Sequence, residues 1–191
     1  MSAKREAFRS KLREALVEEC GPSILESPCY LKGLCWNLDK SRCRCAMESL
    51  RQFVKVQGKF TLDLGCGTGM TSVELVGRGA EVVSLDISKR WLKLARLRFD
   101  LAGLKGHLVL ADAQYLPFKR YCFDIAICDN VIEHVPKQQA LLREICRVLK
   151  DSGFLYLATP SKTSIRNILR DPHYLLPAYD VLPQNFAQKY V

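Results

Sequence analysis

Between residues 59 and 160, short apolar runs alternate with stretches of helical periodicity. The runs are rich in Val, Ile and Leu and polar only near their ends, which is typical of parallel strands covered on both faces. We predict strands over residues 60–64, 82–85, 107–111, 123–128 and 154–158. Helical patterns separate most of them, at residues 70–78, 88–102 and 137–149. This alternation predicts an α/β domain over residues 59–160, with a doubly wound, mostly parallel sheet and right-handed crossovers.

Two flanking segments differ from this α/β domain. Residues 1–58 predict an N-terminal helical cap that packs on or over the binding edge of the sheet, with one helix from about residue 40 to residue 56. The first helix of this cap is amphipathic, because one face carries Phe8, Leu12, Ala15 and Leu16. Beyond the last predicted strand, prolines interrupt the chain at Pro160, Pro172, Pro177 and Pro183. For residues 161–191 we therefore predict a C-terminal tail of loops and one short helix, with no further strand.

Charge and cysteine content narrow the classes of function. The net charge of +9 forms no long basic block, so binding to nucleic acid is permitted but not indicated. No apolar run approaches the roughly 20 residues of a membrane-spanning helix. Nine cysteines without a secretory segment predict free thiols and a cytoplasmic location. A metal site is not expected, because the spacing of Cys29, Cys35, Cys43 and Cys45 lacks the paired two-residue gaps of common zinc sites.

A glycine-rich loop, Gly65-Cys66-Gly67-Thr68-Gly69, follows the first predicted strand. Glycines at alternate positions let the backbone turn sharply and approach a ligand closely. The helix that starts near Met70 then directs its N-terminus at that ligand. A tight strand-to-helix turn without a ligand is the alternative interpretation. The dinucleotide fingerprint requires glycine where Met70 stands, which disfavours a nicotinamide-dependent oxidoreductase.

Carboxylates stand at the ends of four predicted strands, where ligands bind in open α/β sheets. Asp63 precedes the glycine loop, where it would repel a pyrophosphate but suit a cationic group. Asp86 is placed to accept hydrogen bonds from ribose hydroxyls, and Asp112 from an exocyclic adenine amine. Asp129 follows the fourth strand. Caps and turns are the alternative roles for such residues, but together they predict a pocket for a nucleoside joined to a cation, the form of S-adenosylmethionine.

The motifs also resemble a known family, the class I (Rossmann-like) S-adenosylmethionine-dependent methyltransferases. The segments that carry the resemblance are residues 62–69, Asp86, 111–113, 123–124, 131–135 and 144–150. The pattern is most similar to the bacterial-type small-molecule methyltransferases and covers about residues 59–160. It implies strands in the order 3-2-1-4-5, and residues 161–191 do not read as the family's strands 6 and 7. We therefore expect a truncated C-terminal tail, with a naturally short sheet as the alternative.

The resemblance implies a set of cofactor-binding residues. The set comprises Asp63, Gly65, Cys66, Gly67, Gly69, Asp86, Ile87, Asp112, Ala113, Asp129 and Asn130. The three glycines would flank the methionine moiety, with Asp63 assisting its ammonium. Asp86 would hold the ribose, and Asp112 with the amide of Ala113 would bind adenine. The backbone near Asp129 would receive the ammonium.

The leading function is methyl transfer from S-adenosylmethionine to an unidentified small-molecule acceptor, leaving S-adenosylhomocysteine. No catalytic base is assigned: His134 is a candidate, but a helix-start or packing role is favoured, and His173 and Tyr174 are equally unassigned. Since strands 6 and 7 are not found, a methyltransferase-like binding or regulatory module without turnover is the alternative. The apolar strand over residues 154–158 would then present an edge open to self-association.

Overall fold

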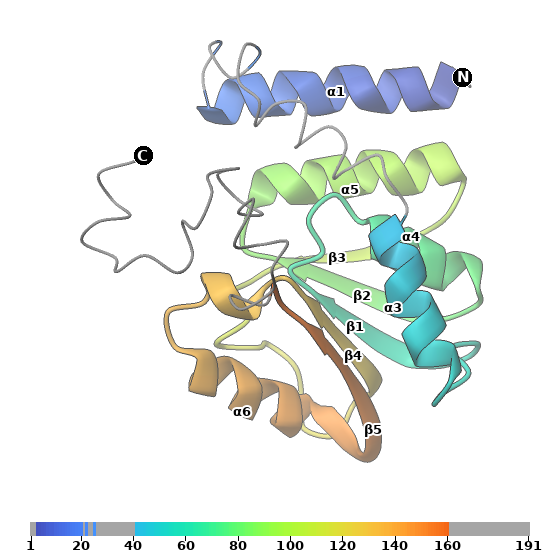
Figure 1. Cartoon of the computed structure of the whole chain (residues 1–191), viewed down its shortest axis with the longest axis vertical. Coiled ribbons are helices and arrows are strands. Elements are labelled where there is room, and N and C mark those ends of the chain that lie inside the picture. The colour runs from blue at the N-terminus through green and yellow to red at the C-terminus, as the bar shows by residue number, and fades with distance from the viewer. Residues whose placement is uncertain (1–2, 21, 23–24, 26–40, 161–191) are drawn as a thin grey trace. The chain divides into compact units, whose positions relative to one another are not determined.

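The computed structural model describes residues 3–20, 22, 25 and 41–160. Its centre is a five-stranded sheet in the order β3-β2-β1-β4-β5, in which every neighbouring pair is parallel (Figure 1). The strands are β1 Phe60–Leu64, β2 Glu81–Asp86, β3 His107–Leu110, β4 Phe123–Asp129 and β5 Leu149–Ala158. The predicted fold class and strand order are confirmed. The prediction of no further strands falls on residues 161–191, which lie outside the described residues.

Helices cover both faces of the sheet because successive strand residues point to opposite sides. On one face, Leu62 and Leu64 of β1 pack in a core with helix α6, Gln138–Val148. On the other face, Ile125 and Ile127 of β4 pack with helix α3 (Ser41–Arg51) and helix α4 (Met70–Gly77). Helix α3 ends earlier than the predicted residue 56.

Helix α5, Lys89–Ala102, has the ends that the sequence predicts. The Ser88 hydroxyl accepts a hydrogen bond from the Trp91 amide at 3.4 Å, and Gly103 closes the helix with a φ of 68°. Glycine suits that left-handed conformation because it has no Cβ.

Helix α1, Ala3–Cys20, lies beside α5 (Figure 1). Phe8 and Leu12 are buried in a small cluster with Leu94 of α5. In the structure α1 therefore packs on α5, and the packing of residues 1–58 on or over the binding edge of the sheet stays a prediction. The side chains of Ala15 and Leu16 lie outside the described residues. Within the described parts of the chain, no helix combines the length and apolar character needed to cross a bilayer.

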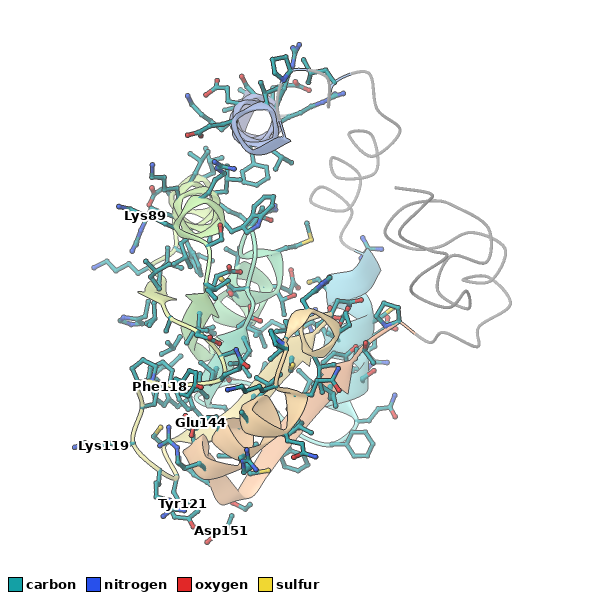
Figure 2. All side chains as sticks on the ribbon, turned by 90° about the vertical axis from the view of Figure 1, so that its left-hand side faces the viewer. Lys89, Phe118, Lys119, Tyr121, Glu144 and Asp151 are labelled. Carbon is teal, nitrogen blue, oxygen red and sulfur yellow. The ribbon has the colours of Figure 1, made fainter. Side chains whose placement is uncertain are left out.

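Strand β5 begins earlier than predicted, because α6 runs directly into it. Leu149 pairs with Phe123, and after an irregularity the register resumes with Phe154 opposite Ile125. An ion pair in α6 supports this region: Arg147 contacts Glu144 at 2.7 Å and also donates to the Phe118 carbonyl oxygen at 2.7 Å. In Figure 2, Phe118 and Glu144 lie close together, away from Lys89 at the start of α5. The loop before β4 is thus tied to α6.

Candidate cofactor site

A cavity of about 610 Å³ lies where the carboxyl ends of the strands meet their following loops. Its volume is within the usual range for small-ligand sites. Several residues of the predicted binding set line it, namely Gly65, Gly67, Asp86, Ile87, Asp112, Ala113 and Asn130. These residues lie at or just after the ends of β1, β2, β3 and β4, which the parallel sheet brings to one edge.

The glycine loop that joins β1 to α4 needs glycine for two separate reasons. Gly65 has a φ of 60°, and a Cβ there would collide with the Val131 side chain. Gly69 has a φ of 74° and packs so closely on α5 that a Cβ would lie 3.0 Å from the Ala95 Cβ. Both residues adopt a left-handed conformation that other side chains rarely take. The loop therefore turns sharply and packs closely against Val131 and Ala95.

Asp86 fixes the loop and the start of α5 at the same time. Its Oδ2 accepts a hydrogen bond from the Gly67 amide at 2.9 Å, and its Oδ1 accepts one from the Ser88 amide at 2.8 Å. The residue is 7% exposed and lines the cavity. Since each carboxylate oxygen has a second lone pair, Asp86 retains the capacity to accept from a ligand.

Asp112 is held by a residue that the sequence did not single out. Its carboxylate accepts from the Gln114 backbone amide at 2.8 Å and from the Gln114 side-chain amide at 3.0 and 3.1 Å. The Gln114 side-chain oxygen accepts in turn from the Lys137 amide at 3.1 Å. Gln114 and Trp91 also line the cavity. The sequence could have pointed to Trp91, because it stands three residues after the Ser88 cap, in the first turn of α5 next to the strand end that carries Asp86.

Asp63 is buried behind the glycine loop, at 3% exposure, and is not among the described residues that line the cavity. The Ser72 hydroxyl donates to its Oδ2 at 2.5 Å, and the Ser84 hydroxyl donates to Ser72 at 2.8 Å. Desolvation by burial raises the pKa of Asp63 to about 7, against the lowering effect of Ser72 and with further raising by the charges of Asp129 and Asp86. Asp63 thus lies next to the glycine loop in sequence but outside the described cavity wall, and its role toward a ligand's ammonium stays a prediction.

Three other members of the predicted set also lie away from the described cavity wall. Cys66 is buried, and desolvation raises the pKa of its thiol. Gly69 is the residue before α4. Asp129 ends β4, where its side chain accepts a hydrogen bond from Asn130. Asn130 itself has a φ of 55°. Its backbone amide donates to the Ala158 carbonyl oxygen at 2.8 Å, which links the end of β4 to β5.

His134 lines the cavity, and the role of its side chain stays a prediction. The residue ends the short 3-10 helix η2, Ile132–His134, and its side chain is 60% exposed. The apolar residues Val131 and Val135 on either side of it pack against the core. Its Nε2 lies 3.9 Å from Glu133 Oε1. His173 and Tyr174 lie outside the described residues.

Cysteines and acidic residues do not gather into a metal site within the described ranges. In α3, Cys43 is buried and Cys45 is exposed. Cys29 and Cys35 lie outside the described residues. The described lining of the cavity combines carboxylates, other polar side chains such as Gln114 and His134, and apolar side chains.

Comparisons with known proteins agree with this arrangement. Residues 62–157 match a family described as a methyltransferase domain. A ubiquinone biosynthesis O-methyltransferase from Coxiella burnetii is 29% identical over 113 residues, which are 59% of this chain and 48% of that protein. The chain thus spans about half the length of the curated relatives it matches.

Solved structures show the same fold. A protein from Pyrococcus horikoshii is 32% identical, with a TM-score of 0.59 over 68% of this chain and 60% of that chain. A methyltransferase from Aquifex aeolicus, 19% identical, has a TM-score of 0.59 over 79% of this chain and 85% of its own. At that identity the likeness concerns the fold alone. The family match, together with the sheet order and the glycine loop, places the chain in the class I S-adenosylmethionine-dependent methyltransferase family.

Proposed function

We propose that this chain binds S-adenosylmethionine in the cavity and transfers its methyl group to a small-molecule acceptor. The observation that carries the proposal is the hydrogen bond between Asp86 and the Gly67 amide of the glycine loop, at the wall of the cavity. The charge of the wall supports it: the described lining residues include Asp86 and Asp112 and no lysine or arginine. Such a wall suits a cationic nucleoside and opposes a pyrophosphate, since burying unpaired negative charges together is costly.

The residues of the wall divide by the part of the cofactor that they suit. Asp86 keeps lone pairs for ribose hydroxyls, because the hydrogen bonds that it accepts from two backbone amides use only one lone pair on each carboxylate oxygen. Asp112 and the Ala113 amide suit the polar edge of adenine, and Ile87 and Trp91 supply apolar surface. Gly65 and Gly67 expose backbone to the methionine moiety. When bound, the cofactor supplies a methyl group already activated by the sulfonium.

A hydroxyl oxygen is the acceptor atom that we propose. The curated relatives are named as O-methyltransferases of ubiquinone biosynthesis. A hydroxyl must lose its proton during the transfer, so a base near the cavity assists. His134 is exposed and lines the cavity, and histidine is the side chain that most often transfers protons in enzyme active sites. We assign it the role of proton acceptor.

Methyl transfer from radiolabelled S-adenosylmethionine tests this function. The full chain is assayed with phenols and catechols, and with amines of similar size as the comparison. We expect label in the hydroxyl compounds, loss of that label with Asp86→Asn, and a fall in rate of about 10²- to 10⁴-fold with His134→Gln. Binding of the cofactor without transfer to any acceptor would instead favour the regulatory module.

A further inference from the structure

Arg98 of α5 donates hydrogen bonds to the glycine loop and is not among the described residues that line the cavity. Its Nε donates to the Thr68 carbonyl oxygen at 2.8 Å, and its Nη2 donates to the Thr68 hydroxyl at 3.0 Å. Thr68 is 4% exposed. A guanidinium that makes two such bonds with one residue fixes that residue in orientation as well as in place.

The same guanidinium also contacts the N-terminal helix. Its central carbon lies 4.0 Å from the centroid of the Phe8 ring on α1, a cation–π geometry. Phe8 is 4% exposed and packs, with Leu12, on Leu94 of α5. Burial lowers the pKa of Arg98 to about 10, so the side chain still carries its charge at neutral pH. Phe8 therefore forms one wall of the space that holds the charged group.

The loop is held at two neighbouring residues from two directions. Asp86 of β2 holds the Gly67 amide, and Arg98 holds Thr68, the next residue. Gly65 and Gly67 line the cavity, whereas Arg98 is not among the described residues of its wall. The hydrogen bonds from Arg98 to Thr68 give it a route to a bound ligand through the shape of the loop.

We propose that Arg98 is a positioning residue that keeps the glycine loop in its cofactor-binding shape, and that Phe8 makes this hold depend on the docking of α1. The N-terminal helix then sets the affinity of the cavity for its cofactor, although it lies against α5 and not at the site. This inference rests on the proposed function for the identity of the cofactor, but the hold on the loop is testable without it.

Amide hydrogen exchange without any ligand tests the hold on the loop. In Arg98→Met we expect the amides of Cys66, Gly67 and Gly69 to exchange at least about tenfold faster, relative to the β1 amides, than in the wild type. The ratio to β1 separates loop opening from general unfolding. Arg96→Met is the matched control, since Arg96 lies on the same helix and donates to the Gly106 carbonyl oxygen at 3.3 Å, away from the loop. Equal ratios in the Arg98 and Arg96 variants would overturn the proposal.

Calorimetric titration with S-adenosylhomocysteine then measures the effect on affinity. We expect Arg98→Met to raise Kd about tenfold and Phe8→Leu about threefold, with Arg98→Lys between the wild type and Arg98→Met. Because Phe8 acts through Arg98, the double variant should match Arg98→Met alone. Fully additive effects would overturn the dependence on α1.

The outcomes separate this inference from the proposed function. A wild type that binds S-adenosylhomocysteine, with an unchanged Kd in Arg98→Met, overturns the inference and leaves the function standing. A wild type that does not bind it, with faster loop exchange in Arg98→Met, overturns the function and supports the hold of Arg98 on the loop.

Discussion

Asp63 should make the stability of this fold fall as the pH rises toward neutrality. Burial raises the pKa of its carboxyl from about 3.8 to about 7. Between these values the folded chain holds a proton that the unfolded chain has released. The stabilising contribution of this proton is complete below about pH 4 and is lost as the pH rises through about 7. The group is 3% exposed, so solvent screens the effect little.

The size of the effect follows from the pKa difference. Each pH unit within this window changes the free energy of unfolding by about 1.4 kcal/mol. From about pH 5 to about pH 8, the contribution of Asp63 should therefore fall by about 2.5 kcal/mol. Asp63→Asn keeps an oxygen that accepts from Ser72 but does not titrate. The variant should lack this loss, so its stability relative to the wild type should increase by the same amount.

Urea unfolding followed by circular dichroism at about pH 5, 6, 7 and 8 measures both proteins. The comparison cancels carboxylates that titrate in both chains. Asp124→Asn is the control, because the hydrogen bond from Lys150 lowers the pKa of Asp124. The contribution of Asp124 is present above its ordinary pKa and lost only as the pH falls further, so its difference from the wild type should stay constant over this range. Parallel pH curves for the wild type and Asp63→Asn would refute the account of Asp63.

Two further changes test the loop and the sheet edge. Gly69→Ala should lower the free energy of unfolding by about 2–3 kcal/mol, and the control Gly103→Ala by only about 1 kcal/mol. Both glycines have positive φ, but only a Cβ at Gly69 meets Ala95. Equal losses of stability in urea unfolding would argue against close packing of the loop on α5. Leu155→Lys should reduce self-association through β5, where Phe154, Leu155 and Leu157 are 39%, 38% and 43% exposed; light scattering over a concentration series measures this, and a wild type that stays monomeric throughout would contradict it.

Local signals in the sequence were sufficient for the sheet and for α5. The apolar runs mark the strands, and Ser88 and Gly103 mark the two ends of α5 because capping depends on single residues. The strand ends then bring Asp86 and Asp112 to one edge without further information.

Features that depend on which elements pack together were not visible in the same way. Asp63 lies on the strand face opposite to Leu62, and only the packing of α4 places Ser72 over it. Arg98 and Thr68 are 30 residues apart, and no local pattern links them. The docking of α1 on α5 likewise depends on two apolar surfaces that match only after both helices have formed.

Calorimetric titration of the wild type and of Asp86→Ala with S-adenosylhomocysteine tests the central claim most directly, with NADH as the comparison ligand. We expect the wild type to bind S-adenosylhomocysteine and not NADH. Asp86→Ala should weaken binding by about 1.5–3 kcal/mol, roughly ten- to a hundredfold, because charge-assisted hydrogen bonds are lost. A wild type that binds NADH alone, or equal affinities of the two proteins for S-adenosylhomocysteine, would contradict the assignment of the cavity.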